Sequence, residues 1–205
     1  MLPILYSFRR CPYAMRARIV LAAFKIDYIL REVDLKNKPI ELVNVSAKAT
    51  VPVLLLNDLV IDESLDILTA IAKTDFTGPL VDFVGNLSAD FIKNLNYYKY
   101  PARYDDFKNI EFYQHSLISS LNNLDEILTQ VVLAKHDIAQ IAIYPFVRQL
   151  RQVDRGWFAS VAKDNVLNWL DFWDDFLVKA DVMAKYPAWS GLSDGVLIDS
   201  AKTIV

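Results

Sequence analysis

The stretch LPILYSFRRCPYAMRARIVLAAFK, residues 2–25, decides the fold of this chain. Its first part, Leu2–Ser7, is mostly apolar and predicts a short strand, and Tyr13–Lys25 has the amphipathic pattern of a helix. Pro12 suits the first helical position, because the N–H group that it lacks has no partner there in any helix. The sequence therefore predicts a strand, a loop and a helix, with Cys11 at the N-terminal cap of that helix.

The next fifty residues continue the alternation of strands and helices. Residues 28–33 predict a strand, and residues 39–45 predict a short helix. Residues 51–56 and 59–61 predict two antiparallel strands joined by a two-residue turn, because Asn57-Asp58 separates two apolar runs. Apolar residues at helical spacing predict a further helix over residues 63–73.

Beyond residue 77 the strand signals almost vanish, and long helical patterns cover residues 87–100, 108–135, 137–153 and 161–179. The last fifteen or so residues look irregular. We therefore expect a mixed α/β domain over residues 1–75 and an all-helical domain over residues 87–205, with a linker near residues 74–86.

Composition limits the classes of function. The chain has 205 residues, of which 54% are hydrophobic and 23% charged, a balance that favours a packed core over disorder. The net charge of −3 without a long basic run argues against a nucleic-acid partner. Its apolar runs are much shorter than the roughly 20 residues that cross a bilayer, so we expect no membrane partner.

The chain contains one cysteine, Cys11, and two histidines, His115 and His136. A lone cysteine excludes an internal disulfide framework and is the pattern of a reducing compartment, so we expect a cytoplasmic protein. The histidines lie too far apart in the sequence to form a local ligand pair, and we expect no metal.

Cys11 has a physical reason to be reactive. A thiol in the first turn of a helix faces unpaired N–H groups and the positive end of the helix dipole, which stabilise the thiolate and lower its pKa. Arg9, Arg10, Arg16 and Arg18 can add to that positive field. The alternative is a small buried residue without a chemical role, since free cysteines are often buried.

The chemistry of Cys11 has to involve an external thiol. The residue three positions later is Ala14, and there is no second cysteine to resolve a mixed disulfide. Glutathione is the obvious cytosolic candidate for that thiol.

Four motifs in the first half of the chain resemble the glutathione-binding domain of the glutathione transferase superfamily. They are Arg10-Cys11-Pro12-Tyr13-Ala14-x-Arg16-x-Arg18, Leu35-Lys36-Asn37-Lys38-Pro39, Thr50-Val51-Pro52-Val53-Leu54 and Ile61-Asp62-Glu63-Ser64. In the second half, residues 137–149 resemble the family's buried helix, and Tyr186-Pro187-x-Trp189 resembles its usual ending. The resemblance is closest to the bacterial omega-like, cysteine-type branch. It implies a thioredoxin-like N-terminal domain followed by the family's all-helical C-terminal domain, with glutathione as co-substrate.

The resemblance also implies roles for individual residues. Val51-Pro52 would carry a cis peptide bond and pair with the cysteine of glutathione, although an ordinary edge-strand proline is the alternative. Glu63 and Ser64 open a helix that suits the γ-glutamyl carboxylate and ammonium of glutathione, or they serve only as a helix cap. Lys38 would meet the glycine carboxylate, and its alternative is a solvated surface lysine.

Two positions depart from the family pattern. Ala134 stands where the family usually has Ser or Thr, so the cap that Asp137 provides for a buried helix lacks half of its usual arrangement. Ala49 stands where relatives often have glycine, so we expect the loop there to use a conformation that alanine tolerates.

The second substrate is expected in a cleft between the domains, near Tyr13. A helix broken at Pro101 can place Tyr100, Arg103 and Tyr104 over that cleft, or can leave them simply exposed.

We therefore expect a glutathione-dependent thioltransferase or reductase that forms a mixed disulfide at Cys11, with deglutathionylation and dehydroascorbate reduction fitting the same scheme. Its partners would be glutathione and a small disulfide, conjugate or electrophile, in a possible homodimer. Conjugation of electrophiles is an alternative that Tyr6 and Ser7 keep open, and a non-enzymatic protein-binding module is another. An iron–sulfur carrier fits less well, because Pro12-Tyr13-Ala14 lacks the glycine of that motif.

Overall fold

The computed structural model describes residues 1–200, except for the side chains of residues 88 and 89. It consists of two compact units. The first contains residues 1–75 and the segment from residue 174 onward, and the second contains residues 76–173.

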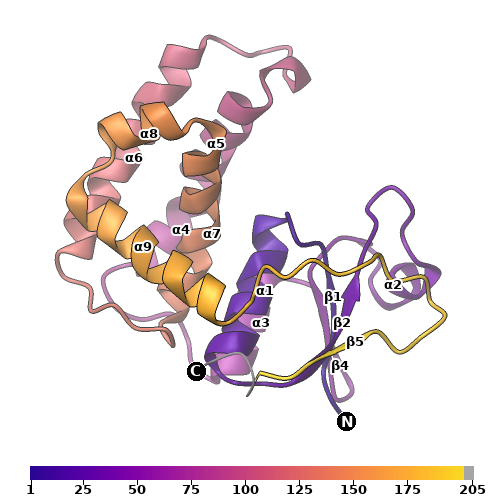
Figure 1. The fold of residues 1–205 in the computed structure, drawn as a ribbon. Helices are drawn as coiled ribbons and strands as arrows, with labels where there is room; N and C mark the ends of the chain where they lie inside the picture. The colour runs from indigo at the N-terminus through magenta and orange to yellow at the C-terminus, as the bar shows by residue number, and fades with distance from the viewer. Residues whose placement is uncertain (201–205) are drawn as a thin grey trace. The chain divides into compact units, whose positions relative to one another are not determined.

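The first unit is built on a five-stranded sheet with the order β4-β3-β1-β2-β5 (Figure 1). The parallel pair is β1 with β2, and every other neighbouring pair is antiparallel. The strand bounds are β1 Ile4–Ser7, β2 Tyr28–Glu32, β3 Val53–Leu56, β4 Leu59–Ile61 and β5 Val196–Ile198. The first four strands are the ones that the sequence predicts, and together with their helices they give the thioredoxin-like domain.

Helices α1 (Pro12–Ala23) and α3 (Ser64–Ala72) pack side by side against the sheet, and the short α2 (Ile40–Val45) lies apart from them (Figure 1). Cys11 is the N-cap of α1 and Pro12 its first residue, as predicted. The amphipathic pattern of this segment predicts one buried and one exposed face of α1. In the structure every residue from Ala14 to Ala23 is buried, including Arg16 and Arg18. Those two arginines have partners inside the protein, which explains how charged side chains are accommodated there.

The predicted hairpin between β3 and β4 is confirmed. Leu56 pairs with Leu59, which leaves Asn57 and Asp58 as the turn. Asn57 has a φ of 54°, a conformation that asparagine adopts more easily than most residues.

The C-terminal segment differs from its predicted irregular structure, because it joins the first unit as β5. This strand extends the sheet beyond β2, with Tyr28 opposite Ile198. The segment is held further by Trp189, whose N–H donates to the Glu32 carbonyl at 2.7 Å. Gly195 has a φ of 116°, and a Cβ there would lie 2.6 Å from the Leu30 carbonyl oxygen. The close approach of the C-terminal segment to β2 therefore requires glycine at this position. The helical unit therefore ends at residue 173, whereas the sequence analysis expects an all-helical domain over residues 87–205.

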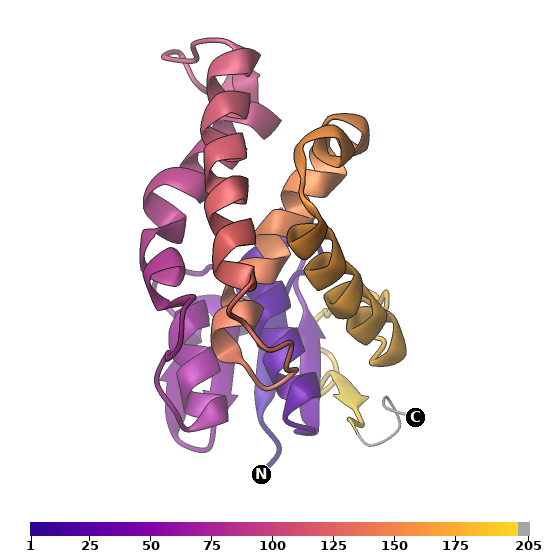
Figure 2. The same ribbon diagram turned by 90° about the vertical axis from the view of Figure 1, so that its left-hand side faces the viewer.

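The second unit is helical. Its elements are α4 Val81–Asn86, the π-helical turn η1 Leu87–Phe91, α5 Ile92–Lys99, the 3₁₀ turn η2 Pro101–Arg103, α6 Ile110–Leu128, α7 Ile138–Val153, α8 Arg155–Val161 and most of α9 Asp164–Lys179. Helix α5 runs beside the long α6 (Figures 1 and 2). Helices α7 and α9 follow the predicted ranges, and the range 87–100 is divided between η1 and α5. Helix α6 ends at Leu128, whereas the sequence predicts a helix up to residue 135. Helices α4 and α8 are too short to give a periodic signal of their own.

A cluster of aromatic side chains lies in the core of the second unit, among buried leucine, isoleucine and valine side chains. Trp169, Trp173 and Tyr144 are each no more than 1% exposed, and the ring of Tyr144 contacts both tryptophans. These tryptophans therefore have a packing role in the second unit.

The N-terminus of α7 shows how the chain compensates for Ala134. The Asp137 carboxylate accepts hydrogen bonds from the N–H groups of Ala139 (2.9 Å) and Gln140 (3.2 Å), as the predicted cap requires. The fully buried Gln140 amide also donates to Asp137 at 2.9 Å and accepts from the Trp169 indole at 3.1 Å. Gln140 therefore supplies a second contact to the capping carboxylate from inside the helix.

Across residues 1–200, none of the helices has both the length and the apolar composition needed to cross a bilayer.

Candidate functional site

A cavity of about 500 Å³ in the first unit contains all the site residues that the sequence predicts within that unit. Those residues are Cys11, Tyr13, Lys38, Val51, Pro52, Glu63 and Ser64. They come from the start of α1, the loop before α2, the loop before β3 and the start of α3. The wall is completed by Leu35, Ala49, Thr50 and Asp62, which the sequence analysis did not assign to the site.

Cys11 lies at the junction of α1 and the loop before β3. Its backbone N–H donates to the Phe8 carbonyl at 2.9 Å, which fixes the turn that leads into α1. Its thiol donates to the Val51 carbonyl oxygen, with Sγ and O 3.8 Å apart. The Val51–Pro52 peptide bond is cis, the isomer that the family resemblance implies.

The protonation of Cys11 differs from the prediction. Burial raises the pKa of its thiol above the usual range, because desolvation disfavours the thiolate. The N–H groups of Ala14 and Tyr13 and the charge of Arg16 act in the predicted direction and lower the pKa, but their effect is smaller than that of burial. The hydrogen bond to Val51 also favours the protonated form, since a carbonyl oxygen stabilises S–H and not S⁻.

The positive field that the sequence predicts around Cys11 is reduced, because one of its arginines is paired with a carboxylate. Arg18 forms a buried ion pair with Glu32 and donates to Ser7. Arg10 lies over the Phe8 ring, with its guanidinium carbon 5.3 Å from the ring centroid. Of the arginines near the cysteine, Arg16 is the one that lowers the pKa of the thiol.

Arg16 connects α1 to the start of α3. Its Nη1 donates to the Ser64 hydroxyl at 3.0 Å, and its guanidinium carbon lies 5.6 Å from the centroid of the Tyr13 ring. The Arg16 side chain is almost completely buried, and desolvation lowers its pKa to about 10. A single buried cation therefore touches two residues that line the cavity.

The N-terminus of α3 faces the cavity with Glu63 as its N-cap and Ser64 as its first residue. Glu63 accepts from Lys48 at 2.6 Å, and Asp62 accepts from Lys48 at 3.1 Å. Asp62 also accepts from the Ser46 hydroxyl at 2.8 Å; this bond is the largest of the effects that lower the pKa of Asp62, and the bond to Lys48 adds to it. The sequence analysis gave no role to Lys48 or Asp62, although Asp62 is part of the motif Ile61-Asp62-Glu63-Ser64.

The conformation of Ala49 also differs from the prediction. Its φ is 46°, in the left-handed region that alanine tolerates poorly, and its N–H donates to the Ser46 carbonyl at 2.9 Å. The loop therefore keeps a glycine-type conformation without glycine. Lys38, also on the cavity wall, is exposed, so its ammonium is hydrated.

The remaining predicted cleft residues belong to the second unit. The guanidinium carbon of Arg103 lies 3.9 Å from the centroid of the Tyr100 ring, and Tyr104 stacks on Tyr97 with a centroid distance of 3.8 Å. These contacts account for their local packing, and their role in a second-substrate cleft stays a prediction.

Tyr6 and Ser7, whose hydroxyl groups are the sequence-based argument for glutathione conjugation, do not line the cavity. Tyr6 is 1% exposed and receives a hydrogen bond from Arg31 at 2.6 Å, and Ser7 is fully buried and accepts from Arg18 at 2.8 Å. The residues with a hydroxyl group that do line the cavity are Tyr13, Thr50 and Ser64, and burial raises the pKa of Tyr13.

Within residues 1–200, no three or more His, Cys, Asp or Glu side chains form a group that could hold a metal ion.

Comparison with known proteins gives results consistent with this architecture. Residues 10–74 match the family model for the glutathione S-transferase N-terminal domain. A "probable glutathione transferase" from Aplysia californica is 44% identical over 57 residues, which cover 28% of this chain and 62% of that relative. The chain thus spans less than two thirds of the length of this relative.

Solved structures resemble the chain over most of its length. A glutathione transferase family member from Pseudomonas fluorescens, with two glutathione bound, is 18% identical, has a TM-score of 0.68 and is matched over 89% of this chain and 91% of its own. Glutathione transferase Omega 3C from Trametes versicolor is 16% identical, with a TM-score of 0.69 over 93% of this chain and 86% of its own. At these identities the likeness shows that the chain has the glutathione transferase fold.

Proposed function

We propose that the protein is a glutathione-dependent thiol transferase of the omega-like, cysteine type, with Cys11 as the nucleophile. The observation that carries the proposal is that the one cysteine of the chain lines the same cavity as every predicted glutathione-binding residue. Solved structures of the same fold whose names include bound glutathione or bound glutathione disulfide add support.

In the proposed binding mode, the two ends of glutathione meet opposite walls of the cavity. The γ-glutamyl carboxylate would be held by Ser64 and the N–H groups at the start of α3, where the helix dipole favours an anion. Its ammonium would be held by Glu63, whose contact with Lys48 is exposed and therefore weak. The cysteine of glutathione would pair with the backbone of Val51, and Lys38 would meet the glycine carboxylate.

The proposed reaction is thiol–disulfide exchange in two steps. The Cys11 thiolate attacks the glutathionyl sulfur of a mixed disulfide R–S–S–G, the S–S bond breaks, and R–S⁻ leaves and takes up a proton. The thiolate of a second glutathione then attacks the glutathionyl sulfur on Cys11, which regenerates the Cys11 thiolate and releases oxidised glutathione. The substrate disulfide is reduced, and one free glutathione is consumed in each cycle.

Glutathione conjugation is the second candidate, and the observation that favours it is the position of Tyr13. The Tyr13 hydroxyl shares the cavity with Cys11, and a hydroxyl donor can stabilise the thiolate of bound glutathione without forming a disulfide. In that reaction Cys11 would be dispensable.

The two candidates can be separated with three proteins and two assays. Wild type, Cys11→Ser and Tyr13→Phe are compared in the reduction of hydroxyethyl disulfide by glutathione and in the conjugation of 1-chloro-2,4-dinitrobenzene. We expect the wild type to reduce the disulfide, Cys11→Ser to lose that activity by at least about 100-fold, and Tyr13→Phe to retain it.

The opposite pattern rejects the proposal. If Cys11→Ser conjugates as well as the wild type and Tyr13→Phe does not, conjugation is the reaction. If all three proteins are inactive and calorimetry detects no glutathione binding, the chain is a binding module that keeps only the fold.

A further inference from the structure

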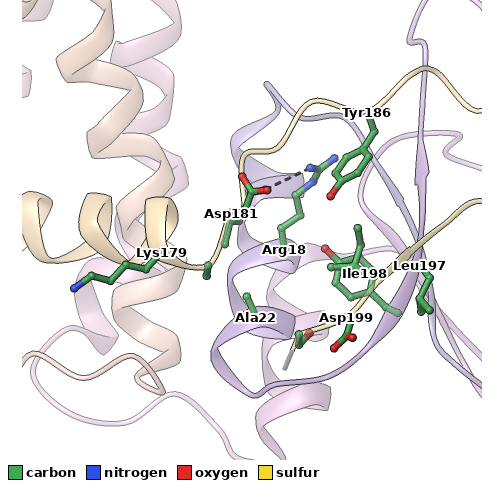
Figure 3. Close-up of a pocket in the computed structure, with 12 residues that line it drawn as sticks. Arg18, Ala22, Lys179, Asp181, Tyr186, Leu197, Ile198 and Asp199 are labelled. Atoms are coloured by element: carbon green, nitrogen blue, oxygen red, sulfur yellow. Dashed lines mark hydrogen bonds between the residues drawn. The ribbon is translucent and has the colours of Figure 1, made fainter. Parts of the chain in front are cut away.

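The first unit contains a second cavity, of about 390 Å³, whose cationic side chains are paired within the protein (Figure 3). Arg18 forms the buried ion pair with Glu32, and the Lys179 ammonium lies 2.9 Å from a carboxylate oxygen of Asp175. Figure 3 also shows Asp181 beside Arg18. Both cations on the wall of this cavity therefore have their partners in the chain itself.

The charge pairs at the candidate glutathione site are of another kind, because their carboxylates line the cavity in which a ligand is expected. Asp62 and Glu63 are both on the cavity wall, and the Lys48 ammonium bridges them, 3.1 Å from Asp62 and 2.6 Å from Glu63. The proposed function assigns Glu63 to the ammonium of the γ-glutamyl group. An ammonium of the chain itself therefore contacts the carboxylate that the ligand's ammonium is expected to use.

The loop between α2 and β3 places Lys48 over the start of α3. The hydroxyl of Ser46, a residue that is 4% exposed, donates to the Asp62 carboxylate at 2.8 Å and joins the loop to α3. The Ala49 N–H donates to the Ser46 carbonyl at 2.9 Å, which closes a tight turn around Lys48. The backbone of Lys48 is thus fixed on both sides, whereas its side chain is 49% exposed and can turn toward solvent.

Lys48 and a ligand ammonium compete for the same negative charge. The hydrogen bonds to Glu63 and Asp62 raise the pKa of Lys48, so this side chain stays charged throughout the neutral pH range. Two ammonium groups on one carboxylate repel each other, and the ligand's ammonium is therefore expected to displace Lys48. Because the pairs of Lys48 are largely exposed, this displacement has a small cost.

We propose that Lys48 is an internal competitor for the γ-glutamyl ammonium, which lowers both the affinity of the site for glutathione and its selectivity for ligands that carry that ammonium. The inference rests on the proposed function, because it requires a γ-glutamyl ligand at Glu63. A ligand without the ammonium finds the two carboxylates already compensated by Lys48. If Lys48 is removed, the same ligand lies beside two uncompensated carboxylates, and only an ammonium can compensate them. Lys48 is thus a specificity-determining residue that takes no part in the chemistry at Cys11.

Two matched ligands test this competition by calorimetry at pH 7 on the full chain. One is S-methylglutathione, and the other is the same compound with hydrogen in place of the ammonium, S-methyl-N-glutaryl-cysteinylglycine. The S-methyl group prevents disulfide formation with Cys11, so binding is measured whether or not the protein turns over. The proteins are wild type, Lys48→Met, Lys48→Arg and the control Lys93→Met, which removes the same charge from an exposed position in α5 of the second unit.

We expect Lys48→Met to bind S-methylglutathione about threefold more tightly than the wild type, and to bind the analogue without the ammonium no more tightly. The preference for the ammonium therefore rises at least about threefold. Lys48→Arg keeps a cation on the two carboxylates and is expected to show no gain for either ligand. Lys93→Met is expected to bind both ligands like the wild type.

Three results would overturn the role of Lys48: an unchanged preference for the ammonium in Lys48→Met, an equal gain for both ligands, or a gain in Lys48→Arg as large as that in Lys48→Met. If neither ligand binds to any of the proteins, the competition and the proposed glutathione site are rejected together. If S-methylglutathione binds but the wild type does not reduce hydroxyethyl disulfide, only the proposed reaction is rejected, and the calorimetric preference still decides the role of Lys48.

Discussion

The ion pair between Arg18 and Glu32 gives the sharpest test of how the first unit is held together. The Arg18 side chain is 1% exposed and that of Glu32 is 10% exposed, so neither charge is well solvated. Glu32 also accepts from the backbone N–H of Arg9 at 2.7 Å, two residues before Cys11. The pair therefore links α1, β2 and the loop that carries the reactive cysteine.

Glu32→Gln keeps the shape of the side chain and removes its charge. The Arg18 guanidinium then stays buried without a counter-charge, and breaking a buried pair in this way costs about 3–5 kcal/mol. The amide oxygen of glutamine can still accept one hydrogen bond, so we expect a loss of about 3 kcal/mol in the free energy of unfolding. For a chain of this length, that corresponds to a decrease in Tm of roughly 6–12 °C.

Urea denaturation followed by tryptophan fluorescence and circular dichroism measures this loss. The matched control is Asp175→Asn, the same carboxylate-to-amide change in a surface pair, where Asp175 and Lys179 are both more than half exposed. Such a pair contributes about 0.3–0.5 kcal/mol. A loss below 1 kcal/mol for Glu32→Gln, indistinguishable from that of the control, would refute the argument that the buried charge depends on its partner.

Three further predictions concern the candidate site and one concerns the helical unit. Because burial raises the pKa of Cys11 above its usual 9.0, and the thiolate forms only as pH rises through that pKa, alkylation by iodoacetamide should be slow at pH 7 and keep rising beyond pH 9.0. Arg16→Met removes a charge that stabilises the thiolate, so alkylation at pH 8 should slow about fivefold, equivalent to roughly 1 kcal/mol of lost attraction. Ala49→Gly should raise the free energy of unfolding by about 0.5–1 kcal/mol, since relief of the left-handed strain exceeds the added chain entropy of glycine; a lower Tm by calorimetry would contradict this. Asp137→Ala removes two capping hydrogen bonds from α7 and should cost about 1–2 kcal/mol by urea denaturation.

The parts of the fold that could be predicted from the sequence are those with local signals. Pro12 marks the start of α1, Asn57-Asp58 marks the turn between β3 and β4, and long apolar periodicity marks α6 and α7. Strand β5 has no such signal, because it has three residues and depends on β2 for its hydrogen bonds.

The sequence predicted most of the residues of the candidate site, but it did not predict their protonation and charge pairing. Motif resemblance identified seven of the eleven residues that line the cavity, since each motif is local. The protonation of Cys11 depends on how deeply it is buried, and the neutralisation of Arg18 depends on Glu32, fourteen positions away in the chain. Likewise, the left-handed Ala49 is set by the loop around it and not by the preference of alanine.

The order in which the chain is synthesised has a consequence for β5. The ribosome releases residues 1–75 long before residues 196–198, so the nascent sheet passes through a period in which β2 is its unprotected edge. Tyr28, Leu30 and Glu32 then lack the neighbours that they have in the finished protein, and the exposed backbone of β2 can pair with another chain. Strand β5 therefore covers the edge of the sheet only after the helical unit has been synthesised. If translation stopped before residue 196, the fragment would keep β2 as an exposed edge strand and would be prone to aggregation.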